Sequence, residues 1–292
     1  MAESGATKRY ADYFSQIMKL RCPTRCAVVT GGNKGIGYEV CRQLASNGVL
    51  VVLTARDEKR GTEAVDSLKA SGLSDVLFHQ LDVADPSSVA SLADFIKTSF
   101  GKLDILVEER MEYIMQYISG TYESSKECLD INYYGTKRVT EALLPSLRLS
   151  NSARIVNVSS SAGLLQNFGR ERAIEVLNNI DENTEQKVDE LLNEFLKDFK
   201  EGSIEAKGWP HRSVAAYFLS KAAVNAYTRC LAKKFPSICI NCVCPGFVKT
   251  DINFNIGLLT AEEGAESIVR LALLPDDSPT GLFFRNKEVS VF

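Results

Sequence analysis

The sequence predicts an α/β fold, a doubly wound parallel sheet of about seven strands with helices on both faces. From Cys26 onward, short runs of β-branched and apolar residues alternate with longer stretches of helical periodicity. The short runs are apolar almost throughout, as expected for strands that are covered on both faces. A glycine-rich turn follows the first of these runs directly. The 292 residues suit one domain of this kind.

The apolar runs place the strands, and the periodic stretches between them place the helices. Strands are expected at Cys26–Thr30, Val49–Thr54, Val76–Gln80, Ile105–Val107, Arg154–Ser159, Ile238–Val243 and Gly281–Phe284. Helices are expected at Ile36–Asn47, Glu58–Ala70, Ser87–Phe100, Tyr122–Leu149, Ala215–Phe235 and Ala261–Leu274. Asp85 followed by Pro86 marks one helix start, because Asp caps free amides and Pro suits the first helical position.

Three segments stand outside this alternation. Residues 1–24 carry basic and apolar residues, but Glu3, Asp12 and the lack of a Ser/Arg bias favour a flexible, solvated tail over an organelle transit peptide. Residues 25–292 are then expected to form a single domain. Glu108–Gly120 does not fit the alternation, and neither does Gln166–Pro210, a polar stretch with helical periodicity in Ile180–Lys200.

Composition excludes several classes of function. A formal charge of −3 and a pI near 5.6, with acids and bases interspersed, give no basic surface for nucleic acid. No apolar run approaches the roughly 20 residues that span a bilayer, so no membrane partner is expected. Eight cysteines without a signal peptide, several of them in apolar runs such as those at Cys26, Cys242 and Cys244, favour reduced thiols and a cytoplasmic location. Two histidines and no Cys/His spacing of the zinc type predict no metal site.

The glycine-rich turn is the first candidate binding element. It reads Thr30-Gly31-Gly32-Asn33-Lys34-Gly35-Ile36-Gly37 between a strand and a helix. Loops collect glycine for turns regardless of ligand, but this placement favours a Rossmann dinucleotide site with the pyrophosphate at the helix N-terminus. The candidate cofactor contacts in the turn are Gly31, Asn33, Lys34, Gly35, Ile36 and Gly37.

The spacing T-G-x-x-x-G-x-G resembles that of short-chain dehydrogenases/reductases. The second strand ends without the acid that would hold a ribose 2′-hydroxyl, and Arg56 together with Lys34 would instead pair with a 2′-phosphate. These two residues could also be ordinary surface charges. We therefore expect NADP(H) as the cofactor. The resemblance also implies that Asp82 and Val83, after the third strand, contact the adenine.

Reduction of a ketone requires a proton for the developing alkoxide, and a tyrosine can supply it if a cation stabilises the phenolate. A Lys four residues later lies on the same helical face. This Y-x-x-x-K spacing occurs three times, as Tyr122/Lys126, Tyr133/Lys137 and Tyr217/Lys221. Spacing alone therefore cannot identify the proton donor.

The order of neighbouring motifs favours Tyr217 with Lys221. This pair follows the strand that ends in a triple serine and precedes Cys244-Pro245-Gly246-Phe247-Val248-Lys249-Thr250, as in the family. The resemblance assigns substrate orientation to Ser160, with Ser159 and Ser161 as open alternatives, and a proton relay to Asn132. It makes the other two Tyr/Lys pairs helix-surface coincidences. Pro245, Val248 and Thr250 would contact the cofactor.

The resemblance extends from Cys26 to Phe292 and is greatest to the plant branch that includes salutaridine reductase and the menthone and neomenthol reductases. Residues 78–83, FHQLDV, and 100–107, FGKLDILV, are typical of that branch. It implies an NADPH-dependent carbonyl reductase acting on a small hydrophobic ketone, terpenoid or alkaloid in type. It also implies that the insertion at about 166–210 covers the face that other members use to dimerise, so that this chain is a monomer.

One departure from the family follows Val107. The family continues with Asn-Asn-Ala-Gly, whereas this chain reads Glu108-Glu109-Arg110-Met111-Glu112. Bulky charged residues cannot reproduce the small Ala-Gly pair. Either the chain is a variant with impaired turnover, or Glu108–Gly120 forms a shortened helix over an altered pocket. A non-catalytic NADP-binding or interaction protein is therefore the second functional hypothesis.

Overall fold

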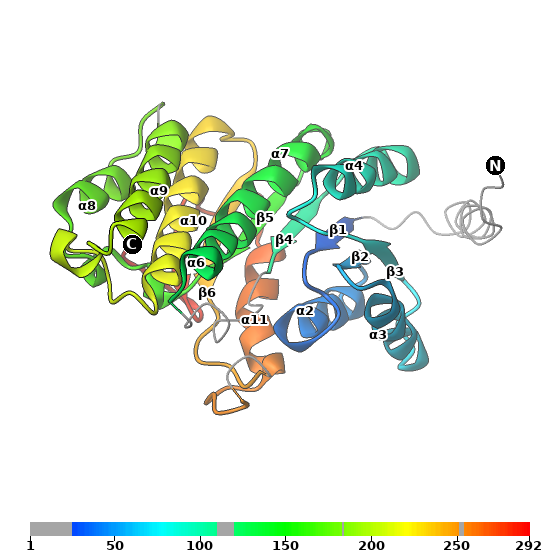
Figure 1. Cartoon of the computed structure of the whole chain (residues 1–292). Helices are drawn as coiled ribbons and strands as arrows, with labels where there is room; N and C mark the ends of the chain where they lie inside the picture. Colours follow the sequence, from blue (N-terminus) through cyan, green and yellow to red (C-terminus); the bar gives the residue numbers. More distant parts are fainter. Residues whose placement is uncertain (1–24, 110–119, 183, 251–253) are drawn as a thin grey trace, which may run out of the picture.

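A computed structural model describes residues 25–109, 120–182, 184–250 and 254–292. Within them, eight strands form one sheet in the order β3-β2-β1-β4-β5-β6-β7-β8 (Figure 1). The strands are β1 Cys26–Val29, β2 Leu50–Ala55, β3 Val76–Gln80, β4 Ile105–Glu108, β5 Arg154–Val158, β6 Cys239–Cys244, β7 Phe283–Arg285 and β8 Glu288–Ser290. Strands β1 to β7 pair with one another in parallel, which confirms the doubly wound sheet.

The helices divide into two layers, one on each face of the sheet (Figure 1). They are α2 Gly35–Ser46, α3 Glu58–Ala70, α4 Pro86–Phe100, α6 Tyr122–Leu129, α7 Gly135–Leu147, α8 Glu171–Asn178, α9 Thr184–Lys200, α10 Ala215–Lys234 and α11 Ala261–Ala272. Helices α2, α3 and α11 enclose one core, and the remaining helices enclose the other. Successive residues of a strand point to opposite faces, so Val28 joins one core and Val29 the other. This explains why the strands are apolar throughout.

The seven strands expected from the sequence form within two residues of their expected ends, and β8 was missed. It pairs antiparallel with β7 through a two-residue turn in which Asn286 has a φ of 56°. It spans only three residues, begins with an exposed glutamate and shows little apolar character. The apolar signal on which the other predictions depended is absent there.

The expected helix over Tyr122–Leu149 is interrupted. The chain forms α6, then a π-helical segment at Asp130–Tyr134, and then α7. Such wide turns occur frequently at functional sites, and this one contains Asn132. Sequence periodicity does not distinguish this widening from a continuous helix.

The expected insertion folds mainly into α8 and α9, which pack against α10, and α9 also packs against α6. Helix α9 buries Val188, Leu192 and Phe195, and its Asp189 accepts a hydrogen bond of 2.9 Å from Lys137 of α7. The insertion is therefore integrated into the helical layer beside the sheet. No helix within the described ranges is long and apolar enough to cross a membrane. The expected tail at residues 1–24 lies outside those ranges.

Asp104 joins the amino ends of β1, β4 and β5. Its carboxylate, 1% exposed as a residue, accepts hydrogen bonds from the Cys26 amide at 2.8 Å, the Lys102 ammonium at 2.8 Å and the Ser150 hydroxyl at 2.6 Å. Burial alone would raise the pKa of Asp104, but these three donors together hold it below its ordinary value. The ionised carboxylate therefore stabilises the fold.

We expect Asp104→Asn to lower the free energy of unfolding at neutral pH by about 1–3 kcal/mol, because buried donors lose their acceptor. Since the folded pKa is lowered, this contribution is present above the unfolded pKa of about 3.9 and disappears as pH falls through the folded value. Urea unfolding at pH 7 and below pH 4 measures the difference. Asp94→Asn, at an exposed position of α4, is the control. Equal losses for both variants would contradict the assignment.

Candidate active site

The glycine turn between β1 and α2 is tightly folded. Gly31 and Gly35 have φ angles of 63° and 55°, and a Cβ on Gly37 would lie 2.3 Å from the Gly31 carbonyl oxygen. Glycine is therefore required at all three positions. Lys34 is the extended N-cap residue of α2, and its side chain does not cap the helix. The first amides of α2 thus face the turn, as an anion site requires.

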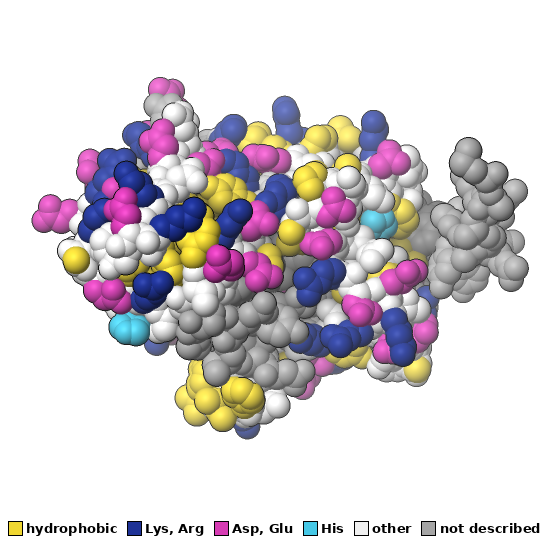
Figure 2. Space-filling view, in the orientation of Figure 1, with side chains coloured by type: hydrophobic (Ala, Val, Ile, Leu, Met, Phe, Trp, Pro, Cys, Tyr) yellow, Lys and Arg dark blue, Asp and Glu magenta, His cyan; other side chains and the backbone are white. Residues whose placement is uncertain are grey.

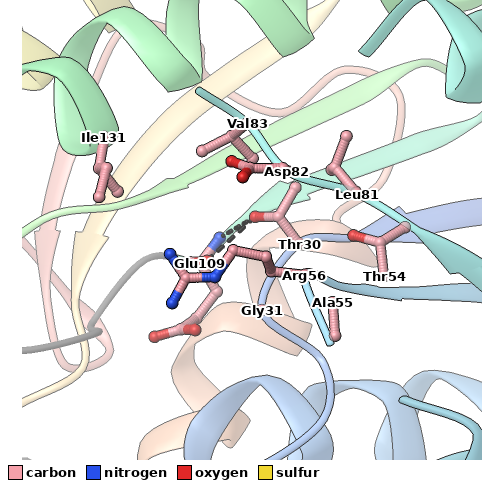
Figure 3. Close-up of a pocket in the computed structure, with 10 residues that line it drawn as sticks. All are labelled: Thr30, Gly31, Thr54, Ala55, Arg56, Leu81, Asp82, Val83, Glu109 and Ile131. Carbon is pink, nitrogen blue, oxygen red and sulfur yellow. Dashed lines mark hydrogen bonds between the residues drawn. The ribbon is translucent and has the colours of Figure 1, made fainter. Parts of the chain in front are cut away.

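A pocket lies beside this turn, at the carboxyl ends of the first four strands (Figure 3). It is lined by Thr30, Gly31, Thr54, Ala55, Arg56, Leu81, Asp82, Val83, Glu109 and Ile131. Four of the expected cofactor residues, Gly31, Arg56, Asp82 and Val83, are brought together here. The parallel arrangement of the strands produces this convergence, because their ends meet at one edge of the sheet.

The pocket suits the nucleoside end of a dinucleotide. The Asp82 carboxylate accepts from the Ala84 amide at 2.9 Å, and the Val83 carbonyl accepts from Arg138 at 2.7 Å, so both groups are held in place. Arg56 is exposed at the rim, where its guanidinium can meet a phosphate. These residues could hold an adenosine.

Glu109 also lines this pocket, although it is not among the cofactor contacts expected from the sequence. Its side-chain Oε2 and its backbone oxygen both lie 2.9 Å from the position of a Cβ on Gly31, and the residue is only 6% exposed. The Thr30 hydroxyl donates to the Glu109 carbonyl at 3.0 Å and accepts from the Glu109 amide at 2.9 Å. A carboxylate is thereby held against the glycine turn. Residues 110–119, which include most of the expected shortened helix, lie outside the described ranges.

Tyr217 and Lys221 lie one turn apart on α10 and are 8% and 1% exposed. The Lys221 Nζ is 5.8 Å from the centre of the Tyr217 ring and donates to the Val158 carbonyl at 3.0 Å. Burial raises the pKa of Tyr217 well above its ordinary value, and a hydrogen bond with the Ser160 side chain opposes that increase. The charge of Glu109 adds a smaller increase. The phenol is therefore held protonated.

The three serines after β5 point in different directions. Ser160 is the one that is hydrogen-bonded to Tyr217, and its Oγ also accepts from the Ala162 amide at 3.1 Å. Ser159 is fully buried and donates to the Lys221 carbonyl at 3.3 Å. Ser161 donates to the Cys244 sulfur at 3.4 Å. The geometry thus favours Ser160 among the alternatives that the sequence left open.

Asn132 faces α10 from the π-helical segment. Its Nδ2 donates to the Ser220 hydroxyl at 3.1 Å, and Ser220 in turn donates to the Tyr217 carbonyl at 2.7 Å. Its Oδ1 is buried without a partner among the described residues. Asn132 therefore contacts α10 at Ser220, the residue before Lys221, and its Oδ1 could accept a hydrogen bond in a proton relay.

The other two Tyr/Lys pairs lie elsewhere. Tyr133 is fully buried in the core, so its interpretation as a helix-surface residue was wrong. Lys137 instead pairs with Asp189. Tyr122 is half-buried beneath the Lys200 ammonium, which is 4.4 Å from its ring centre. The Tyr-x-x-x-Lys spacing alone does not show whether the tyrosine lies in the core or on the surface of its helix.

The Pro-Gly loop brings its residues beside the turn. Pro245 and Val248 are buried, and Val248 forms an isolated parallel bridge with Leu259. The Cγ2 of Thr250 lies 3.7 Å from the position of a Cβ on Gly35, so Thr250 faces the glycine turn. Within the described residues, no group of three His, Cys, Asp or Glu side chains could hold a metal.

Comparison with known proteins identifies the family. Residues 25–171 match the model described as short chain dehydrogenase, and residues 202–275 match a second one, described as enoyl-(acyl carrier protein) reductase. The chain is 54% identical to (+)-neomenthol dehydrogenase of Capsicum annuum, over 92% of this chain and 98% of that protein. The chain belongs to the short-chain dehydrogenase family.

Two further relatives bear on the site of this short-chain dehydrogenase. The solved structure of salutaridine reductase from Papaver somniferum matches with a TM-score of 0.82 and 53% identity, over 90% of this chain and 99% of that one. Carbonyl reductase [NADPH] 3 of Mus musculus is 38% identical over 92% of this chain and 99% of that protein. The match to the plant branch expected from the motifs is confirmed, and the family identifies the cofactor as a nicotinamide dinucleotide.

The alignment of this short-chain dehydrogenase with the Capsicum enzyme includes positions that the chain lacks. The alignment with the Capsicum enzyme extends over 308 positions, and 92% of 292 residues is about 269. About 39 aligned positions therefore have no counterpart in this chain. The alignment length does not locate these positions, and the shortened segment after Val107 stays a prediction.

Gly163 determines how closely the serine segment approaches the tyrosine helix. A Cβ on Gly163 would lie 2.6 Å from the Lys221 carbonyl carbon and 2.7 Å from the Ala222 amide nitrogen. We expect Gly163→Ala to lower the free energy of unfolding by about 1–3 kcal/mol through overpacking, as measured by urea unfolding. Gly169→Ala is the control, because the nearest atom to its Cβ is 3.4 Å away. A tolerated Gly163→Ala would show that this approach is not tight.

Proposed function

We propose that this short-chain dehydrogenase is an NADPH-dependent carbonyl reductase that converts a hydrophobic ketone, terpenoid or alkaloid in type, to a secondary alcohol. The observation that carries the proposal is the convergence of Tyr217, Lys221 and Ser160 at the sheet edge that also holds the nucleotide pocket. The names of the plant relatives and of the murine NADPH carbonyl reductase support the substrate and cofactor classes.

The chemistry is divided between the cofactor and the protein. NADPH, when bound, supplies a hydride to the carbonyl carbon. Tyr217 then gives its phenolic proton to the carbonyl oxygen, and the Ser160 hydroxyl orients that oxygen. The Lys221 ammonium, buried on the same helical face, stabilises the phenolate that remains. The Asn132 Oδ1 has no partner among the described residues. It can therefore accept a hydrogen bond from the group that returns a proton to Tyr217.

The segment between β6 and α11 suits an apolar substrate. Phe254, Ile256 and Leu258 are 71%, 67% and 82% exposed, and Figure 2 shows hydrophobic side chains gathered at the corresponding edge. Backbone hydrogen bonds from Leu258 and Leu259 to the Phe247 carbonyl, at 2.7 and 3.0 Å, hold this segment against the Pro-Gly loop. Exposed apolar groups of this kind mark binding surfaces.

A second candidate is an NADP-binding protein without turnover. The observation that favours it is the Glu108-Glu109 pair, which places acidic side chains where the family has two asparagines. The two candidates make different predictions for turnover and the same prediction for cofactor binding.

We expect Tyr217→Phe to reduce ketone-dependent NADPH oxidation at least a hundredfold, because the proton donor is removed. The assay follows the loss of reduced-cofactor absorbance with a panel of cyclic terpenoid and alkaloid ketones. Tyr122→Phe, which removes the hydroxyl from another Tyr/Lys pair, is the matched control and should retain the rate. If the wild-type protein binds NADPH but turns over no ketone faster than Tyr217→Phe, the second candidate holds.

We also propose a monomer, because α8 and α9 pack over α10, and α9 also packs over α6. Light scattering on the purified protein should give a mass near the chain mass of 32.2 kDa across the accessible concentration range. A mass of twice this value would contradict the proposal.

A further inference from the structure

We infer that Glu109 weakens the preference of this site for NADPH over NADH, because its carboxylate disfavours NADPH more than NADH. The inference rests on the proposed function and concerns the nucleotide pocket alone. In this inference Glu109 and Arg56, which line the same pocket (Figure 3), have opposite effects on NADPH binding.

The first support is the position of the Glu109 side chain. It lines the pocket with Arg56 and Asp82, and Oε2 lies 2.9 Å from the position of a Cβ on Gly31. Any ligand that fills the pocket beside Gly31 must meet this carboxylate or move it. Since the residue is 6% exposed, water screens the charge poorly.

The second support is the way in which the backbone of Glu109 is fixed. The Thr30 hydroxyl bonds both the amide and the carbonyl of Glu109, and the Thr30 amide donates to the Val107 carbonyl at 3.0 Å. Thr30 itself is 1% exposed. These hydrogen bonds hold the end of β4 against the start of the glycine turn. The Glu109 carboxylate therefore leaves the pocket through a change of its side-chain rotamer.

The third support is the charge of the lining. The ionisable side chains that line the pocket are Arg56, Asp82 and Glu109, which together carry one positive and two negative formal charges. NADH and NADPH share the pyrophosphate, and they differ in the 2′-phosphate, which adds a charge of about −1.5 to −2. A fixed negative charge in the pocket therefore opposes NADPH more strongly. Burial is the main cause of the raised pKa of Cys41 and of Tyr217, and the charge of Glu109 adds a smaller increase to each.

The experiment measures dissociation constants for NADPH and NADH by isothermal titration calorimetry with the full chain. We expect Glu109→Gln to tighten NADPH about tenfold, equivalent to about 1.4 kcal/mol, and to tighten NADH by clearly less. Glu109→Asp, which keeps the charge, should leave the ratio near the wild-type value. Arg56→Gln should shift the ratio in the opposite direction.

Glu108→Gln is the matched control, because Glu108 is an adjacent buried acid that does not line the pocket, and its ratio should not change. Thermal melting of every variant verifies that it is folded. An unchanged NADPH/NADH ratio in Glu109→Gln, with both cofactors bound, would overturn the inference and leave the proposed function standing. Absence of binding by all folded variants would overturn both.

Discussion

The parallel hydrogen-bonded register of β1 to β7 is the constraint on which the rest of this structure depends. Parallel strands end at one edge, so the turn after β1, the loop after β3, the end of β4 and the serines after β5 meet there. These segments are far apart in the sequence. The site residues at strand ends are placed by the register of their strands, and the helices between strands fill the two cores and carry Tyr217, Lys221 and Asn132 to the same edge.

Much of this edge could be predicted, because its motifs have local physical causes. Gly31, Gly35 and Gly37 are glycines because the turn leaves no room or angle for a side chain, and that requirement is visible in the sequence. The preference for Tyr217 over two equivalent pairs rests on its place between the serines after β5 and the loop after β6, which are neighbouring strands, and its catalytic role stays a proposal. The fold class followed from the apolar strands, which alternate between two cores.

Other features could not be predicted, because they depend on contacts between segments. The π-helical turn at Asn132 leaves the hydrophobic periodicity almost unchanged, and the burial of Tyr133 depends on how this turn packs against α10, where the Tyr133 ring meets that of Tyr227. Strand β8 lacks the apolar run that would indicate a strand. The place of Glu109 depends on Thr30, a residue 79 positions away in the chain, and on the absence of a side chain at Gly31.

Glu109 also links the two halves of the site. Its carboxylate lies against the glycine turn. Its charge also adds to the effect of burial in raising the pKa of the Tyr217 phenol. The phenol therefore stays protonated at neutral pH, and the Lys221 ammonium must stabilise the phenolate once the proton has left. The carboxylate that we infer to oppose a phosphorylated cofactor thus also adds a small amount to the stability of the phenol over its phenolate, so one side chain acts on both halves of the site.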